Sequence, residues 1–175
     1  GDVYKRQKQL LLHHDDALKA DWPDDVTKVV ANIPYQISSP LIKKLTRHLK
    51  AQTNPIAHVV LMLQLEFAQR LSMNHPADIG SLGLTVALDW DVEEHHIVPP
   101  HHFSPQPAVQ SQVVGMKPHG REFPVDKRLL QQMIHHAFDQ RRKKIRSSMK
   151  KAPRRISRIK GLSLIHISEP TRPLH

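Results

Sequence analysis

The sequence predicts an α/β fold, in which strands alternate with helices, followed by the start of a basic α-helical segment. Two features lead to this prediction. Apolar, β-branched runs at 26–34 and 57–63 are each followed by residues with helical spacing, which is typical of a sheet with parallel strands. After Asp126 the strand pattern stops and a long amphipathic pattern begins. The 175 residues suffice for one domain or one and a half.

The first part of the chain predicts two strands and a helix. Residues 8–14 have the pattern of a strand that ends at one of its two histidines, and the acidic pair that follows suits a turn. Residues 26–34 suit a buried parallel strand because they are rich in β-branched side chains. One of the serines at 38–39 can cap the next helix, with Pro40 at its first position.

The remaining elements follow in order. Residues 57–63 predict a strand that passes directly into a helix, and residues 81–103 predict a helix or strand, a further strand containing the core residue Trp90, and a Pro-rich turn. Residues 108–118 alternate in the manner of an edge strand. Asp126 is expected to cap a helix whose apolar stripe consists of Leu129, Leu130, Met133, Ile134, Ala137 and Phe138.

The positive charge of the chain is concentrated in one segment. The net charge is +10, and the run "RRKKIRSSMKKAPRRISRIK" at 141–160 contains eleven Lys and Arg residues and no Asp or Glu. The rest of the chain is close to neutral, so the run suits contact with a polyanion such as RNA or DNA. By composition alone, a solvated basic tail without a polyanion partner is an equally good interpretation of this run. An anionic membrane surface fits less well, because the run has few large apolar side chains.

Several classes of site are excluded by composition. The chain has no cysteine, which rules out disulfides, thiolate zinc sites and cysteine nucleophiles, and an intracellular, cytoplasmic protein is expected. No apolar run is long enough to cross a bilayer, and no signal peptide is visible. Four pairs of adjacent histidines lack the spacing of metal ligands, so no metal site is predicted.

Both ends of the sequence have an unusual character. "DVYKRQ" at 2–7 and "LSLIHI" at 162–167 back-translate to strings that are reverse complements of each other, and they resemble a transposon end used to build sequencing libraries. We therefore expect adapter-derived tails and a protein truncated at both ends. A cluster of Gly and Pro near 118–124 indicates a domain boundary. The expected divisions are a tail at 1–7, a sheet domain at 8–118, a helical segment at 119–161 and a tail at 162–175.

The stretch "NIPY", Asn32 to Tyr35, carries the chemistry that the sequence predicts. A parallel strand directs its carboxyl end toward the ligand crevice of an α/β sheet. The Asn32 amide oxygen and the Pro34 carbonyl are acceptors, and Tyr35 offers a flat face for stacking. Together they suit a planar ring that carries an amino group. Acceptors out of the ring plane favour a pyramidal amine whose lone pair points outward, so catalysis would rest on position and fixed dipoles.

These residues resemble those of a known family. "NIPYQISSP" is similar to motif IV of the ribosomal RNA adenine dimethyltransferases, which include the bacterial kasugamycin-sensitivity methylase and its archaeal and eukaryotic relatives. Four further segments resemble family motifs in the same order along the chain, and together they span nearly all of residues 8–161. These segments are "DDALK", "LMLQLEFAQRL", "FSPQPAVQSQVV" and "AFDQRRKKIRSS".

The resemblance implies a partial Rossmann-like sheet that uses S-adenosylmethionine, followed by the start of a basic helical domain. Asn32 and Pro34 would hold the target amine of a flipped adenine in rRNA. Tyr35 and Phe103 would stack on the two faces of the base, and Asp16 and Asn32 would contact the cofactor. The family's glycine-rich cofactor loop would precede Asp16 and is not recognisable here. We therefore expect this chain alone to bind S-adenosylmethionine poorly and to be inactive.

The same resemblance implies partners and an RNA-contacting segment. The expected partner is small-subunit rRNA in a pre-30S type of particle, bound by a monomer during ribosome biogenesis. The residues expected to contact the RNA backbone are Arg141, Arg142, Lys143, Lys144 and Arg146. Two alternatives stay open at this point. One is a large-subunit rRNA methylase of the macrolide-resistance type, and the other is a non-catalytic ribosome-assembly or transcription factor on the same fold.

Overall fold

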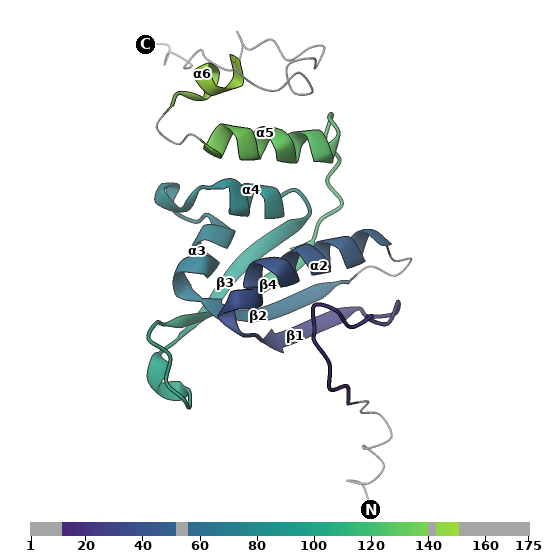
Figure 1. The fold of residues 1–175 in the computed structure, drawn as a ribbon, viewed down its shortest axis with the longest axis vertical. Coiled ribbons are helices and arrows are strands. Elements are labelled where there is room, and N and C mark those ends of the chain that lie inside the picture. Colours follow the sequence, from purple (N-terminus) through teal and green to yellow (C-terminus); the bar gives the residue numbers. More distant parts are fainter. Residues whose placement is uncertain (1–11, 52–55, 140–142, 151–175) are drawn as a thin grey trace, which may run out of the picture.

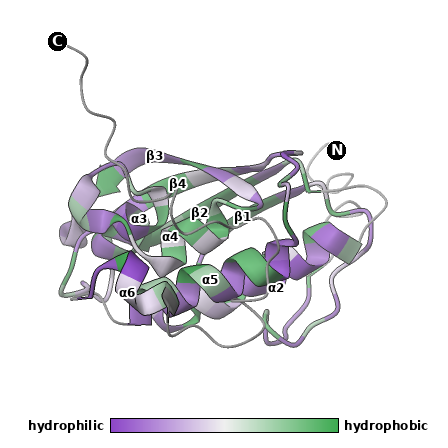
Figure 2. Ribbon diagram, turned by 90° about the horizontal axis from the view of Figure 1, so that it is seen from above, coloured by the Kyte–Doolittle hydropathy of each residue, from purple (hydrophilic) through white to green (hydrophobic). Residues whose placement is uncertain are grey.

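The computed structural model describes residues 12–51, 56–139 and 143–150. They form a four-stranded sheet in the order β1-β2-β4-β3, accompanied by helices (Figure 1). The α/β class predicted from the sequence is confirmed. The helices lie to one side of the sheet, as Figure 2 shows. The burial along β2 agrees, because every second residue is buried and those between are only half-buried.

The parallel part of the sheet matches the sequence prediction. Strand β1, Lys28–Asn32, pairs in parallel with β2, His58–Gln64. The helix α2, Ser38–Ala51, connects them, and α3, Leu65–Ser72, follows β2 directly. A parallel pair requires a long crossover, and an amphipathic helix provides it while covering the sheet.

The start of α2 differs from the prediction. A 3₁₀ turn at Tyr35–Ile37 leads straight into the helix, which begins at Ser38 and places Pro40 at its third residue. The Ser38 hydroxyl donates a 2.8 Å hydrogen bond back to the Tyr35 carbonyl. The predicted capping arrangement is therefore wrong, because this hydroxyl stabilises the preceding turn.

The exposure of β1 also corrects a prediction. Val30 is 81% exposed in a strand that was expected to be buried. It pairs with Val60, so its side chain is on the face of the sheet opposite the buried Val59 and the helices. The described part of the first predicted strand, residues 12–14, is not a strand, and Leu12 is 88% exposed. Strand β1 pairs with β2 along one edge, and its other edge has no strand partner among the described residues.

The last two strands turn the sheet into a mixed one. Strand β3, Trp90–Val98, and strand β4, Ser111–Pro118, are antiparallel, and β4 is also antiparallel to β2. The prediction of an edge strand at 108–118 is therefore wrong, because β4 lies between β2 and β3. The alternation of apolar and polar residues along a strand indicates which face is buried. It does not indicate whether the strand has one or two neighbouring strands in the sheet.

The core lies between the sheet and the helices. It contains fully buried side chains from α2, β2 and α3 together with Val86 at the end of α4, Ser81–Val86. Trp90 is 1% exposed, as predicted for a core residue, and its indole N–H donates a 2.9 Å hydrogen bond to Thr46 of α2. This bond satisfies the polar end of a large buried side chain.

The helical segment after the sheet is only partly covered. Helix α5, Lys127–Asp139, begins where the Asp126 carboxylate accepts the Arg128 N–H at 2.8 Å, so the predicted cap is confirmed. The helix has no buried residue, so its apolar stripe is half-covered. Helical spacing predicts a core position for Met133, and this prediction is wrong because Met133 is only half-buried. Helix α6, Ile145–Lys150, is the last described element. The helices in the described ranges are too short or too polar to cross a membrane.

Candidate active site

The tetrad Asn32 to Tyr35 lies at the carboxyl end of β1. Asn32 is the last residue of the strand, pairs in register with Met62 of β2 and is exposed. Ile33 turns inward and is 8% exposed, which anchors the segment to the core. Pro34 is exposed on the other side of this anchor. The structure therefore exposes Asn32 and Pro34 at the carboxyl end of β1, on either side of the buried Ile33 in sequence.

The backbone of the tetrad already uses part of its hydrogen-bonding capacity. The Pro34 carbonyl accepts the Ile37 N–H at 3.1 Å, which closes the 3₁₀ turn. A carbonyl oxygen has two lone pairs, so one acceptor site of Pro34 remains for a ligand. The Asn32 side-chain amide, exposed at the strand end, supplies a second acceptor and two donors.

Tyr35 is held at two points. Its hydroxyl lies 2.7 Å from the hydroxyl oxygen of Ser111, and its carbonyl accepts the hydrogen bond from Ser38. The ring itself is half-buried. Tyr35 is therefore attached to the first residue of β4, a contact that sequence reasoning missed. The only signal for it was the Ser at the end of the motif "FSPQPAVQS".

Phe103 lies in the connection between β3 and β4. By the strand registers, this connection is at the same end of the sheet as the tetrad (Figure 1). It follows a short 3₁₀ turn at Pro100–His102, and its N–H donates to the Pro100 carbonyl at 3.1 Å. The ring is half-buried. Within the described residues no ring contact joins Phe103 to Tyr35. The structure thus places both aromatic residues at one end of the sheet without stacking them on each other.

Asp16 forms a local turn before β1. Its carboxylate accepts the Leu18 N–H at 2.9 Å, and its carbonyl accepts the N–H groups of Lys19 and Ala20. The side chain is 47% exposed and lies 3.9 Å from the Lys19 ammonium. Among the described residues, the hydrogen bonds and the ion pair of Asp16 are therefore all within its own turn, and none of them joins it to Asn32.

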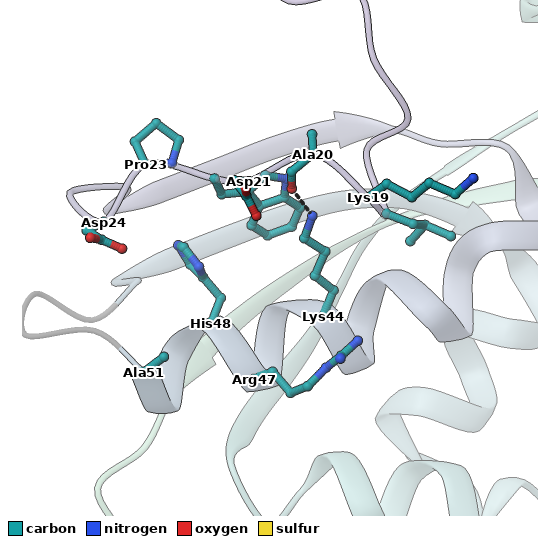
Figure 3. Close-up of a pocket in the computed structure, with 11 residues that line it drawn as sticks. Lys19, Ala20, Asp21, Pro23, Asp24, Lys44, Arg47, His48 and Ala51 are labelled. Carbon is teal, nitrogen blue, oxygen red and sulfur yellow. Dashed lines mark hydrogen bonds between the residues drawn. The ribbon is translucent and has the colours of Figure 1, made fainter.

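A shallow pocket of about 720 Å³ lies between the segment after this turn and helix α2 (Figure 3). The Lys44 ammonium reaches across it to the carbonyls of Ala17, at 2.9 Å, and Ala20. The same ammonium lies 4.5 Å from the ring of Trp22, which meets His48 edge to face. None of the site residues predicted from the sequence lines this pocket. Its contacts tie the segment before β1 to α2.

The predicted RNA-contacting residues are described only in part. Arg141 and Arg142 lie outside the described residues. Lys143, Lys144 and Arg146 are all exposed around the start of α6. These three side chains are thus accessible to a partner. Their exposure alone does not identify that partner. Groups of three or more metal-ligating side chains are absent from the ranges that the structure describes.

A polar cluster that was not predicted from the sequence includes Gln112, the residue after Ser111. Glu94 of β3 receives hydrogen bonds from the hydroxyl of Ser72, in α3, and from the Gln112 amide at 3.2 Å. Gln112 is 3% exposed, and its amide oxygen has no hydrogen-bond partner among the described residues. Ser111 and Gln112 therefore place two buried polar side chains in succession at the start of β4, where the connection that carries Phe103 ends.

Comparison with known proteins places these features in a family. Residues 3–165 match the family described as ribosomal RNA adenine dimethylase. The ribosomal RNA small subunit methyltransferase A of Alcanivorax borkumensis is 37% identical over 151 residues, covering 82% of this chain and 52% of the relative. That of Pseudomonas putida is 39% identical over 147 residues, covering 79% and 54%. The chain spans about half the length of these relatives.

Solved structures agree on the fold. The crystal structure of a dimethyladenosine transferase from Plasmodium falciparum has a TM-score of 0.72 and 29% identity, covering 86% of this chain and 55% of that chain. The 23S rRNA methyltransferase ErmE has a TM-score of 0.60 and 23% identity over 80% of this chain and 56% of its own, a likeness of fold alone. Motif order, sheet architecture and these matches agree, and the chain belongs to the ribosomal RNA adenine dimethylase family.

Proposed function

We propose that this chain is part of a methyltransferase that acts on small-subunit rRNA. The reaction transfers methyl groups from S-adenosylmethionine to the exocyclic N6 amine of flipped adenines. The observation that supports this most is the tetrad at the end of β1, where Asn32 and Pro34 are exposed and Tyr35 is tied to β4. The family and the small-subunit relatives supply the substrate class.

The tetrad suits an amine whose lone pair is delocalised into a purine ring. The Asn32 amide oxygen and the free lone pair of the Pro34 carbonyl would accept the two amine hydrogens. Acceptors that lie out of the ring plane favour a pyramidal nitrogen, which frees its lone pair for attack. The alkylated amine is acidic and loses a proton readily, so no strong base is required. The contribution of the protein is position and fixed dipoles.

S-adenosylmethionine, when bound, supplies a methyl group carried on a sulfonium. The exposed Asp16 carboxylate fits an amino group of the cofactor's adenine, because only one of its oxygens accepts a hydrogen bond within the turn. Asn32, exposed at the strand end, would lie between the cofactor and the target base. The described residues thus fit the adenine end of the cofactor. We assign none of them to its methionine end.

The RNA would be held by stacking and by charge. Extrusion of a base costs a few kcal/mol, less where the base is already unpaired. Stacking on aromatic side chains returns about 1–3 kcal/mol per base, and Tyr35 and Phe103 are the candidates. The exposed cations Lys143, Lys144 and Arg146 would contact the RNA backbone. We further propose that the protein acts as a monomer in the cytoplasm and that its RNA substrate is in a pre-30S type of particle.

The alternatives have less support. Likeness to a large-subunit methylase is one of fold, whereas the relatives at 37–39% identity are named for the small subunit. A non-catalytic assembly factor would not need the acceptors of Asn32 and Pro34, and both residues are present and exposed.

A chimera tests the proposal. Residues 8–161 would replace the corresponding part of the Alcanivorax borkumensis relative, and methyl incorporation into small-subunit rRNA would be measured. Asn32→Ala is expected to lower the rate about 100-fold or more, as loss of a fixed polar contact to the reacting group does. Asn74→Ala, which removes another exposed asparagine amide, serves as the matched control and should leave the rate unchanged. A chimera whose Asn32→Ala variant keeps most of its activity would contradict the proposal.

A further inference from the structure

The contact between Tyr35 and Ser111 joins residues 76 positions apart in the sequence. The two hydroxyl oxygens lie 2.7 Å apart, and either one can be the donor. Ser111 is fully buried, at 0% exposure, and the Tyr35 ring is half-buried. A buried hydroxyl without a partner is unfavourable, so this bond satisfies both groups at once.

Ser111 occupies a rigid position. It is the first residue of β4 and pairs with Gln64 of β2 on one side and Val98 of β3 on the other. The residue before it, Gln110, accepts the Leu65 N–H at 3.0 Å, which ties this point to the start of α3. The backbone of Ser111 is therefore held by three neighbouring segments, and its hydroxyl is a fixed reference point.

Tyr35 occupies a less constrained position. It begins a 3₁₀ turn of three residues after the exposed Pro34. The bond from Ser38 restrains the Tyr35 carbonyl, but it leaves the ring free to change its side-chain torsions. Among the described contacts, the bond to Ser111 is the one that restrains the far end of the ring.

We propose that Ser111 is a positioning residue that sets the orientation of the Tyr35 ring for stacking on the substrate adenine. This use of the contact rests on the proposed function. The same residue ends the connection at 99–110, which carries Phe103. Ser111 thus relates the two aromatic residues of the base site to one fixed point in the sheet, and in this role it acts through Tyr35.

The orientation of Tyr35 can be measured without any substrate. The full chain contains two tyrosines, so Tyr4→Phe followed by 3-fluorotyrosine labelling leaves Tyr35 as the single fluorine probe. Ser111→Ala is expected to shift the Tyr35 fluorine resonance, and Ser111→Thr, which keeps a hydroxyl, should restore it in part. The matched control is Ser148→Ala, because Ser148 is also buried but donates to the His136 carbonyl instead. An unchanged resonance in Ser111→Ala would overturn the inference.

Base stacking forms the second measurement. A single-stranded RNA containing one 2-aminopurine reports stacking by its fluorescence, and its binding would be compared among the wild type, Ser111→Ala, Tyr35→Phe and the double variant. Each single change removes the same bond, so each should weaken binding about three- to tenfold, the range expected for one hydrogen bond. The double variant should bind no more weakly than either single one.

The outcomes separate the two proposals. Additive losses in the double variant would show that Ser111 does not act through Tyr35, and would refute the positioning role. Tyr35→Phe breaks the same bond without altering β4, so unchanged binding by this variant alone would also refute the positioning role, even where Ser111→Ala disturbs folding. A wild-type chain that fails to stack the probe would refute the base-holding function, and with it the use assigned to Ser111, while the fluorine resonance still reports whether the contact orients the ring.

Discussion

Asp89 offers a sharp test of how the helical segment is attached to the sheet. This carboxylate is 4% exposed and lies between two lysines from different helices. One oxygen accepts a 2.9 Å hydrogen bond from Lys127 at the start of α5. The other lies 2.9 Å from the Lys50 ammonium of α2 but lacks hydrogen-bonding geometry, so this second contact is one of charge. Asp89→Ala removes both contacts.

The magnitude follows from burial and geometry. A hydrogen bond to a charged group contributes about 1.5–3 kcal/mol to stability. The contact with Lys50 adds less, about 0–1 kcal/mol, because that side chain is 47% exposed and water screens it. Both lysines reach solvent, so the substitution leaves no buried charge without a partner. We therefore expect a loss of about 2–3 kcal/mol in the free energy of unfolding, a fall of roughly 10 °C in Tm.

The assay is urea denaturation followed by tryptophan fluorescence. A double-mutant cycle with Asp89→Ala and Lys127→Met should give a coupling energy of about 1–2 kcal/mol. Asp91→Ala is the matched control, because Asp91 is 53% exposed and its ion pair with Arg121 is at the surface, where a pair contributes about 0–1 kcal/mol. An Asp89→Ala variant within about 0.5 kcal/mol of the wild type, or a coupling energy near zero, would refute the reasoning.

Two further predictions concern the core and the RNA contact. Trp90→Ala should lower the free energy of unfolding by about 3–5 kcal/mol in urea denaturation followed by circular dichroism, because it creates a large cavity and leaves the Thr46 hydroxyl without its donor. A loss below about 1 kcal/mol would contradict the core assignment. Replacing Lys143, Lys144 and Arg146 with glutamine should reduce the slope of log affinity for single-stranded RNA against log salt by about 0.7 per lost phosphate contact. An unchanged slope would show that these groups do not touch the RNA.

Features that depend on neighbouring residues could be predicted from the sequence. The β2–α3 transition, the Asp126 cap and the core position of Trp90 follow from local pattern, because periodicity and capping act over a few residues. The position of Asn32 at a strand end follows likewise from the β-branched run before it. Ile33 is the buried residue of the tetrad, and Tyr35 is half-buried.

Features that depend on distant partners could not be predicted in this way. The alternation in β4 indicates a strand, but only the pairing with β2 and β3 makes it central. Likewise, only the packing of the helices on one face of the sheet leaves Val30 exposed on the other. The two lysines around Asp89 lie 39 and 38 residues from it, and no local pattern links them.

The sequence alone determined the family motifs and the chemical groups available at the end of β1, because these are properties of residue type and short-range order. Tertiary structure decided how those groups are oriented. Ser111, which is 76 residues from Tyr35 in the sequence, sets the orientation of the Tyr35 ring. Because β4 lies between β2 and β3, the Ser111 hydroxyl oxygen comes to 2.7 Å from the Tyr35 hydroxyl oxygen. Hydrogen bonds act over a few ångströms in space, and which residues meet at that distance depends on the fold.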